Sequence, residues 1–270
     1  MKIRLYDIIF EAAQKIPPAM TYKYNSSTRQ TDRVPEHLYY SEYEDLEEEE
    51  KQLLIEFMHY QNGKDLIDFL VEKGYKKIGE GQGRAVFEFN QYYVLKVSKT
   101  SNSQNKKEID IELNDDVNSI TPTLIAADML KNVWLLVEKV NHIFSSDEEF
   151  EAAAGISLME IEEIIAEARQ TRDLEEAICN LHGQDTVVNN EYDPDEDEEH
   201  EEEVKKVCNP EILKHYMSND VLTGLDALTS TYDLGLGDLL RHEHWGQIGG
   251  YKIVLIDPGW NPMDSFRDKG

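Results

Sequence analysis

The stretch YKKIGEGQGRAVFEFNQYYVLKVSK, residues 75–99, decides the fold of this chain. Its runs YKKIGEG, AVFEF and YYVLKVSK are typical of short β-strands, and Asn90-Gln91 supplies the turn between the last two. Gly79, Gly81 and Gly83 lie between the first two strands, where a glycine-rich backbone can approach a phosphate and offer it N–H donors. A strand follows the glycines where a dinucleotide fingerprint needs a helix, and no Gly-Lys-Ser/Thr follows as in a P-loop. Both of those motifs are therefore excluded.

Lys96 is the unusual residue of the third strand. Side chains alternate along a strand, so Lys96 is predicted to point away from the face that Leu95 and Val97 occupy. On a half-exposed sheet that face is simply the solvent side, whereas under a glycine loop it would face a phosphate. The next segment, SQNKKEIDIELNDDV, is predicted to be helical and carries Glu108 and Glu112 one turn apart. Either glutamate could pair with the lysine.

The remaining elements place this stretch in a mixed fold. LIAADM and VWLLVEKV predict two more strands, which gives three strands, a helix and two strands, a five-stranded sheet carrying one helix. Helices are predicted before and after these strands along the sequence, and a polar, Tyr-rich arm broken by Pro17, Pro18 and Pro35 precedes them. The predicted helices cover 45–60, 64–73, 150–170, 173–183 and 210–232. The second of them stops at Gly74, a good residue for a left-handed cap.

Charge and composition narrow the possible partners. The 270-residue chain has a formal net charge of −28, so direct binding to nucleic acid or to an anionic membrane surface is not expected. Ten of the thirteen residues in 191–203 are carboxylates, as in a solvated loop or disordered insert. The excess charge either keeps the surface soluble or forms an acidic decoy that occupies a basic partner. Two cysteines and no membrane-length apolar run predict a soluble protein of a reducing, cytoplasmic compartment.

The C-terminal stretch RHEHWGQIGGYKIVLIDPGW, residues 241–260, offers a rival metal site. His242 and His244, with Asp257, could bind zinc, but zinc sites typically gather three or four protein ligands and the cysteines are far away in sequence. The two histidines are therefore interpreted as bystanders. Trp245 beside them is most simply a core anchor.

The order of glycine loop, strand lysine, helix glutamate, two-strand hairpin and helical half resembles the protein-kinase-like fold. GEGQGRAVF, VLKV and QNKKE look especially like the small, largely uncharacterised kinase-like proteins of tailed bacteriophages and related viruses. The resemblance covers residues 74–140 and 210–260. It implies an α+β, two-lobed fold with a five-stranded antiparallel N-lobe and a truncated helical C-lobe.

The resemblance further implies a division into four parts. Residues 1–73 form an N-terminal arm and helical extension, and 74–140 the N-lobe. Residues 141–209 are a helical and acidic insert, and 210–270 a truncated C-lobe with the catalytic-like loop. It also suggests a viral protein of the host cytoplasm or the virion.

In the C-lobe, GLGDLLRHEHWG followed by YKIVLIDPG carries the likeness to the family's loop motifs. Asp238 stands where the catalytic-loop aspartate belongs, and Asp257 where the metal-binding aspartate of Asp-Phe-Gly belongs. Glu243, five residues after Asp238, replaces the metal-binding asparagine, and it is a tolerable replacement because a carboxylate can hold Mg²⁺. The resemblance thus implies Asp257 and Glu243 as Mg²⁺ ligands, and Asp238 as the group that orients the nucleophile or accepts its proton.

The same resemblance implies how ATP is bound. Its adenine would lie near Glu138 and Val140, between the five-stranded lobe and the helical half, and the backbone of Gly79, Gly81 and Gly83 would cover the phosphates. Lys96 would contact the α- and β-phosphates and be oriented by Glu108 or Glu112.

Three departures from the family pattern bear on activity. Arg84 stands at the third glycine of the loop, which narrows the space over the phosphates or adds a cation to it. Pro258 replaces the aromatic residue of Asp-Phe-Gly, and only eleven residues follow Gly259, too few for an ordinary peptide-docking platform. The expected function is an ATP/Mg-dependent, protein-kinase-like transfer of phosphate or nucleotide to a protein. The alternative is a catalytically inactive, acidic binding module that engages a host or virion protein.

Overall fold

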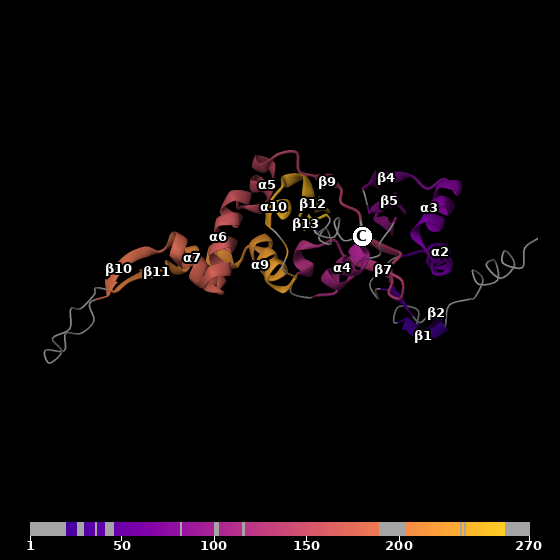
Figure 1. The fold of residues 1–270 in the computed structure, drawn as a ribbon, viewed down its shortest axis with the longest axis horizontal. Coiled ribbons are helices and arrows are strands. Elements are labelled where there is room, and N and C mark those ends of the chain that lie inside the picture. The colour runs from indigo at the N-terminus through magenta and orange to yellow at the C-terminus, as the bar shows by residue number, and fades with distance from the viewer. Residues whose placement is uncertain are drawn as a thin grey trace, which may run out of the picture. The chain divides into compact units, whose positions relative to one another are not determined.

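The computed structural model describes residues 20–25, 30–35, 37–40, 46–81, 83–99, 103–114, 117–188, 203–232, 234 and 236–256. The chain divides into two compact units, one of residues 1–141 with 257–270 and the other of residues 142–256. Each is described by itself (Figure 1). Both are built from antiparallel strands and helices, so the α+β class is confirmed.

A six-stranded antiparallel sheet forms the centre of the first unit, in the order β3-β7-β8-β6-β5-β4. The five predicted strands are all present: β4 (Lys77–Glu80), β5 (Arg84–Glu88), β6 (Tyr93–Ser98), β7 (Leu124–Asp128) and β8 (Trp134–Glu138). The predicted number of five strands is wrong, because β3 (Leu38–Tyr40) pairs along the outer edge of β7. Three residues give too short a run to be distinguished from an irregular arm by periodicity.

The Tyr-rich arm before this strand is also more regular than predicted. Strands β1 (Met20–Asn25) and β2 (Gln30–Pro35) form an antiparallel hairpin. Pro35 closes the ladder opposite Met20, a terminal position at which the missing N–H of proline interrupts no central strand. The irregular arm predicted from Pro35 is wrong at this position, because the proline marks the end of a strand. Pro17 and Pro18 lie outside the described residues.

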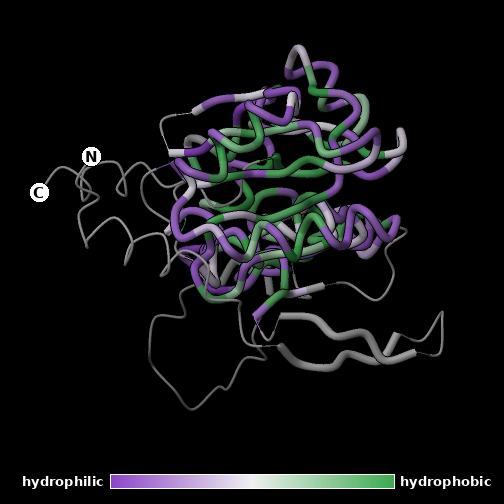
Figure 2. The backbone as a smooth tube through the Cα atoms, turned by 90° about the vertical axis from the view of Figure 1, so that its right-hand side faces the viewer, coloured by the Kyte–Doolittle hydropathy of each residue, from purple (hydrophilic) through white to green (hydrophobic). Residues whose placement is uncertain are grey.

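Two helices cover one face of the six-stranded sheet. These are α2 (Glu48–Phe57) and α3 (Gly63–Glu72), as predicted from their apolar stripes. Their buried side chains join the inward residues of four strands in one apolar core: Leu54, Phe57, Leu66, Leu70, Ala85, Phe87, Leu95, Val97, Ala126, Trp134 and Leu136. Figure 2 shows the hydrophobic residues gathered along the inner strands, with hydrophilic residues on the outer turns.

Local signals at both ends of α3 explain its bounds. The Asn62 side chain accepts a hydrogen bond from the Asp65 N–H at 3.0 Å, which caps the start of the helix. Gly74 adopts φ +82°, which confirms the predicted left-handed ending. Gly63 allows the first turn to touch β6, because a Cβ there would lie 1.5 Å from the Ser98 carbonyl oxygen.

The other face of the sheet is covered by α4 (Ser103–Glu112). A second apolar cluster joins its Ile109 to Val94, Leu124, Ala127, Leu135 and Val137. Lys96 pairs with Val86 and Leu135 across the strands and therefore belongs to this face, as the alternation predicted. That face is buried beneath a helix and is not the solvent side of the sheet.

The second unit is mostly helical. Its elements are β9 (His142–Ile143), α5 (Asp147–Ala154), α6 (Leu158–Thr171), α7 (Leu174–His182), α8 (Pro210–Met217), α9 (Asp220–Tyr232), α10 (Leu236–Leu239), β12 (Trp245–Ile248) and β13 (Lys252–Leu255). The single helix predicted over 150–170 is wrong, since Gly155 ends α5 in a left-handed conformation at φ +70° and Ser157 caps α6. The stretch 210–232 likewise divides at Ser218 and Asn219, where Asn219 Oδ1 accepts from the N–H groups of Val221 and Leu222.

The acidic run itself lies outside the described residues, apart from Glu203. Strands β10 (Gln184–Val188) and β11 (Glu203–Val207) form an antiparallel hairpin on either side of it. This hairpin was not predicted.

Because α3 is buried against the sheet on one face, truncating a side chain should cost much more stability on that face than on the exposed face of the same helix. Leu66 is fully buried, whereas Val71 is 57% exposed. We expect Leu66→Ala to lower the free energy of unfolding by about 2–5 kcal/mol, because it leaves a cavity in the shared core. Val71→Ala, the matched control, should cost less than about 1 kcal/mol. Urea denaturation measures both, and equal effects would contradict the packing of α3 on this sheet.

Candidate functional site

A buried ion pair joins the predicted lysine to one of the two candidate glutamates. Lys96 Nζ donates to Glu108 Oε1, from the middle of β6 to the second turn of α4. Lys96 is 4% exposed and Glu108 is 0% exposed. Moving two charges out of water is costly, and the pair offsets this cost only through close contact and further hydrogen bonds. The structure thus assigns Glu108 as a partner of Lys96, a choice that the sequence left open.

Arg84 places a second cation on the same carboxylate. It begins β5, is 5% exposed, and its Nη1 donates to Glu108 Oε2 and, at 3.4 Å, to Asn105 Oδ1. Each oxygen of Glu108 therefore receives a different cation. The Arg84 side chain therefore lies beneath α4, and its guanidinium is a second cation beside Glu108.

The glycine loop between β4 and β5 is held by its own backbone and by Lys99. The Gly81 N–H donates to the Arg84 carbonyl at 2.9 Å, and the Gly83 carbonyl accepts from the Lys99 N–H at 2.7 Å. Lys99 Nζ donates to the Gly81 carbonyl at 3.1 Å and to Glu80 Oε1 at 2.8 Å. The Gly79 backbone lies against the Val86 side chain. The Gly81 N–H, expected to cover a phosphate, closes the turn in this structure.

Glu138 and Val140 lie at the end of β8 and just after it. The Glu138 N–H donates to the Thr123 carbonyl at 3.1 Å, and its carboxylate accepts from the Thr123 N–H at 3.0 Å. Val140 is partly buried. Glu138 thus fixes the segment before β7, and its backbone N–H is committed to that contact.

In the second unit, Trp245 anchors the loop that carries the other predicted residues. It is fully buried, as predicted, and packs against Phe150 with ring centroids 5.5 Å apart. Its Nε1 donates to the Leu239 carbonyl at 2.6 Å. The indole therefore ties the end of the loop to α10, the short helix that contains Asp238.

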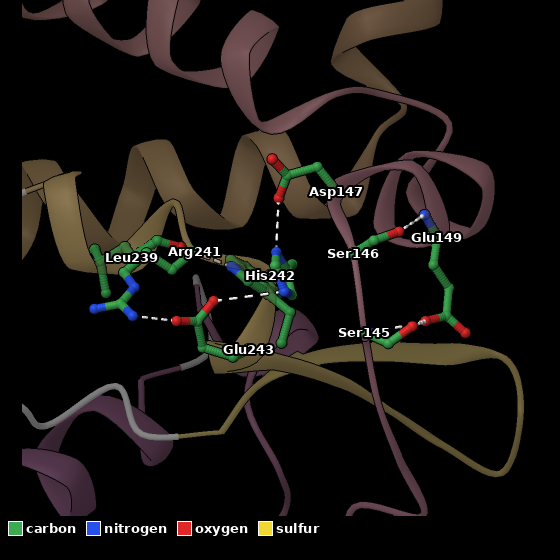
Figure 3. Close-up of polar contacts among 9 residues, drawn as sticks. Ser145, Ser146, Asp147, Glu149, Leu239, Arg241, His242 and Glu243 are labelled. Carbon is green, nitrogen blue, oxygen red and sulfur yellow. Dashed lines mark hydrogen bonds and ion pairs between the residues drawn. The ribbon is translucent and has the colours of Figure 1, made fainter.

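His242 is held by a residue from a distant part of the chain. Its Nδ1 lies 2.8 Å from Asp147 Oδ1 at the start of α5, and its Nε2 lies 3.7 Å from Glu243 Oε2 (Figure 3). His242 therefore has a structural contact, which joins the 3₁₀ turn η2 (His242–His244) to α5. Strand β9 also holds this part of the chain, because it pairs antiparallel with β12.

Glu243, the expected Mg²⁺ ligand, pairs with Arg241 (Figure 3). A backbone hydrogen bond at Glu243 itself, followed by the contact with Arg241, lowers the pKa of its carboxyl group. The side chain of Glu243 is 41% exposed. Its chemistry as an anionic oxygen ligand fits Mg²⁺, which prefers such donors.

Asp257 and its Pro-Gly neighbours lie outside the described residues. Within the part of the chain that the structure does describe, no group of three or more His, Cys, Asp or Glu residues could hold a metal ion. No helix among the same residues is long and apolar enough to cross a membrane.

Two contributors to these sites were missed in the sequence. Asn105 is completely buried and donates through Nδ2 to the Asn132 and Val133 carbonyls, at 3.0 Å each. Asp147 contacts His242 across 95 residues. Asn105 had a weak signal, since it lies one turn before Glu108 on the same helix face. Asp147 had none, because its helix start reads as an ordinary capped terminus.

No protein-family model and no curated protein matches the sequence. Among solved structures, the chain is similar to APH(2")-IIa in its ternary complex with streptomycin and ATP, at 13% identity and a TM-score of 0.25. The match covers 43% of this chain and 39% of that chain. A likeness at this TM-score does not identify a function for the chain.

The bond from Trp245 to Leu239 can be isolated by comparing two buried tryptophans. Trp134 is equally buried, but its Nε1 has no hydrogen-bond partner among the residues the structure describes. We expect Trp245→Phe to cost about 1–3 kcal/mol more than Trp134→Phe, because only the first leaves a buried carbonyl unsatisfied. Urea unfolding of both variants measures the difference. Equal costs would show that the indole N–H does not hold the loop.

The glycine loop gives a prediction for the pKa of Glu80. Hydrogen bonds from Lys77 and then Lys99 lower this pKa to about 2. We expect Lys77→Met and Lys99→Met each to raise it toward the ordinary value of about 4.3, the first more than the second. Because the pKa of Glu80 is lowered in the folded state, its pairing with the lysines stabilises the fold at pH values above the ordinary glutamate pKa. This stabilisation is lost as the pH falls through about 2.

Carboxyl NMR titration measures the pKa, with Lys139→Met as the control. Lys139 contacts a different carboxylate, that of Glu88, so its loss should leave the Glu80 midpoint in place. A midpoint for Glu80 that stays low without both lysines would contradict the assignment.

Proposed function

We propose that the chain is a kinase-like phosphotransferase that binds ATP and Mg²⁺. The observation that supports this best is the buried group of Lys96, Glu108 and Arg84, directly after a glycine loop, on the α4 face of an antiparallel sheet. Apolar residues of similar size at these buried positions would stabilise the fold at least as well, so stability alone does not account for the charged group. Two cations held at fixed positions next to a glycine turn suit a polyphosphate, which needs positioning and charge neutralisation more than covalent chemistry.

Within this proposal Lys96 contacts the α- and β-phosphates, and Glu108 orients it. The backbone of Gly79, Gly81 and Gly83 covers the phosphates, which requires the Gly81 N–H to leave the Arg84 carbonyl when nucleotide binds. Glu138 and Val140 contact the adenine. The assignments to this binding site come from the family resemblance, and the described contacts of Lys96 and Glu108 support them.

The loop residues complete the proposal. Asp238 orients the nucleophile or accepts its proton, and Asp257 with Glu243 holds Mg²⁺, which would neutralise the charge on the phosphates. The hydrogen bond from Trp245 to the Leu239 carbonyl supports the roles of Asp238 and Glu243, because it joins the two ends of the loop 239–245. The acceptor is proposed to be a protein of a host or virion, as the likeness to phage proteins suggests.

A second candidate function is an inactive kinase-like module that engages a protein partner in the host cytoplasm or the virion. The net charge of −28 favours it, because a strongly anionic surface attracts a basic protein. The contact of Glu243 with Arg241 also favours it, since a cation already occupies the expected Mg²⁺ ligand.

Thermal unfolding with and without Mg-ATP tests the nucleotide site. At a hundredfold excess over its dissociation constant, Mg-ATP should stabilise the parent protein by about 2.7 kcal/mol. Lys96→Ala and Asp257→Ala should lose most of this stabilisation, because each removes a group that balances phosphate charge. Lys76→Ala is the matched control, a lysine directly before β4 whose side chain is 73% exposed.

No shift for the parent protein would rule out the ATP site. A shift that persists without Lys96 would contradict the role of the buried ion pair. Stabilisation by Mg-ATP without transfer of phosphate or nucleotide to any protein, the chain itself included, would favour the inactive module.

A further inference from the structure

The first turn of α4 is fastened to the sheet by one amide side chain. Asn105 is fully buried, and its two donated hydrogen bonds reach the carbonyls of Asn132 and Val133, at the start of β8. Its Oδ1 accepts from Arg84 at 3.4 Å. This side chain of α4 thus contacts β5 and the turn directly before β8, and it fixes the helix one turn before Glu108.

The turn between β7 and β8, whose carbonyls accept from Asn105, is held by contacts of its own. Asn132 adopts φ +53°, a left-handed conformation that asparagine tolerates better than most residues. Asp128 Oδ1 accepts from the Leu130 and Lys131 N–H groups at 3.2 and 3.0 Å. Lys131 Nζ donates to the carbonyls of Met58 and Tyr60 at 2.7 Å each, at the end of α2. The β7–β8 turn therefore joins helices from both faces of the sheet.

Arg84, at the start of β5, provides a second attachment of α4 to the sheet. Its guanidinium holds Glu108 Oε2 while Lys96 holds Oε1. For α4 to move away from the sheet, the Glu108 carboxylate would have to leave two buried cations at once. Separating a buried charge from its partners is strongly unfavourable.

We infer that Asn105 and Arg84 are positioning residues that keep α4 docked and hold Glu108 against Lys96 whether or not a ligand is present. The glutamate that orients the lysine is then permanently in place, and the movement of α4 is not available as a switch. The inference deepens the proposed function and depends on it only for the identity of the ligand. The docking itself involves contacts within the first unit alone.

The test combines two readouts that need no nucleotide. Hydrogen–deuterium exchange reports how often the amides of residues 103–112 open, and brief acetylation with acetic anhydride reports the access to Lys96 relative to the exposed Lys76. In Asn105→Asp and Arg84→Met we expect both rates to rise at least about fivefold, because each variant removes one attachment. Asp keeps the shape of Asn105 but loses both amide N–H donors and, when ionised, cannot donate at all; Met keeps the length of Arg84 without its charge.

Two further variants serve as controls. Arg84→Lys retains a cation beside Glu108 and should restore both rates to within about twofold of the parent. Lys106→Met removes a cation from an exposed position of the same helix and should change neither rate. If Asn105→Asp does not fold, Asn105→Ser takes its place, since it also removes both amide donors.

Unchanged exchange and acetylation in Asn105→Asp and Arg84→Met would overturn the inference. Faster exchange that includes α3 as well would also overturn it, because that pattern shows a general loss of stability. Mg-ATP titration forms the third arm, with an expected weakening of about tenfold in both variants. A parent that does not bind Mg-ATP would refute the proposed function but not the docking, whereas equal affinity in parent and variants would refute the positioning of Lys96 for nucleotide.

Discussion

The described part of the first unit depends on one carboxylate, that of Glu108. It is fully buried, and each of its oxygens receives a cation from a different strand of the sheet. A charge in this position is tolerable only when its partners are held in place, so the surrounding elements have to be rigid. Asn105 supplies this rigidity on the side of α4. On the opposite face, α2 and α3 bury the sheet under an apolar core and exclude water from it.

In the second unit, polar residues are also held in place, but by one large aromatic side chain and not by a buried charge. Its loop residues are partly exposed and cannot rely on burial, so they are organised around a single large side chain. Trp245 contacts Phe150 and donates to Leu239, which fixes a loop that has little regular structure of its own. The contact between His242 and Asp147 adds a second attachment, from α5 to the same loop. Rigid support of a loop is the usual way in which polar residues are positioned for chemistry.

Prediction from the sequence succeeded where a local pattern decides the structure. Alternation along β6 placed Lys96 on the face opposite Leu95, and the glycine at 74 ended α3 as expected. It failed where the partner is distant or the run is short. The strand β3 has three residues and becomes a strand only because β7 offers it an edge. The break at Gly155 was missed because the apolar period continues on both sides of it.

The sequence by itself determined the strands β4 to β8 and the helix α4, their order along the chain and the chemistry available to the candidate site. Those features depend on neighbouring residues, through alternation, capping and turn preferences. Only the tertiary structure decided which glutamate meets Lys96, that Arg84 shares it, and that Asn105 fastens the helix between them. These contacts join residues 12 to 28 positions apart, where packing of helix on sheet, and not local propensity, selects the partners.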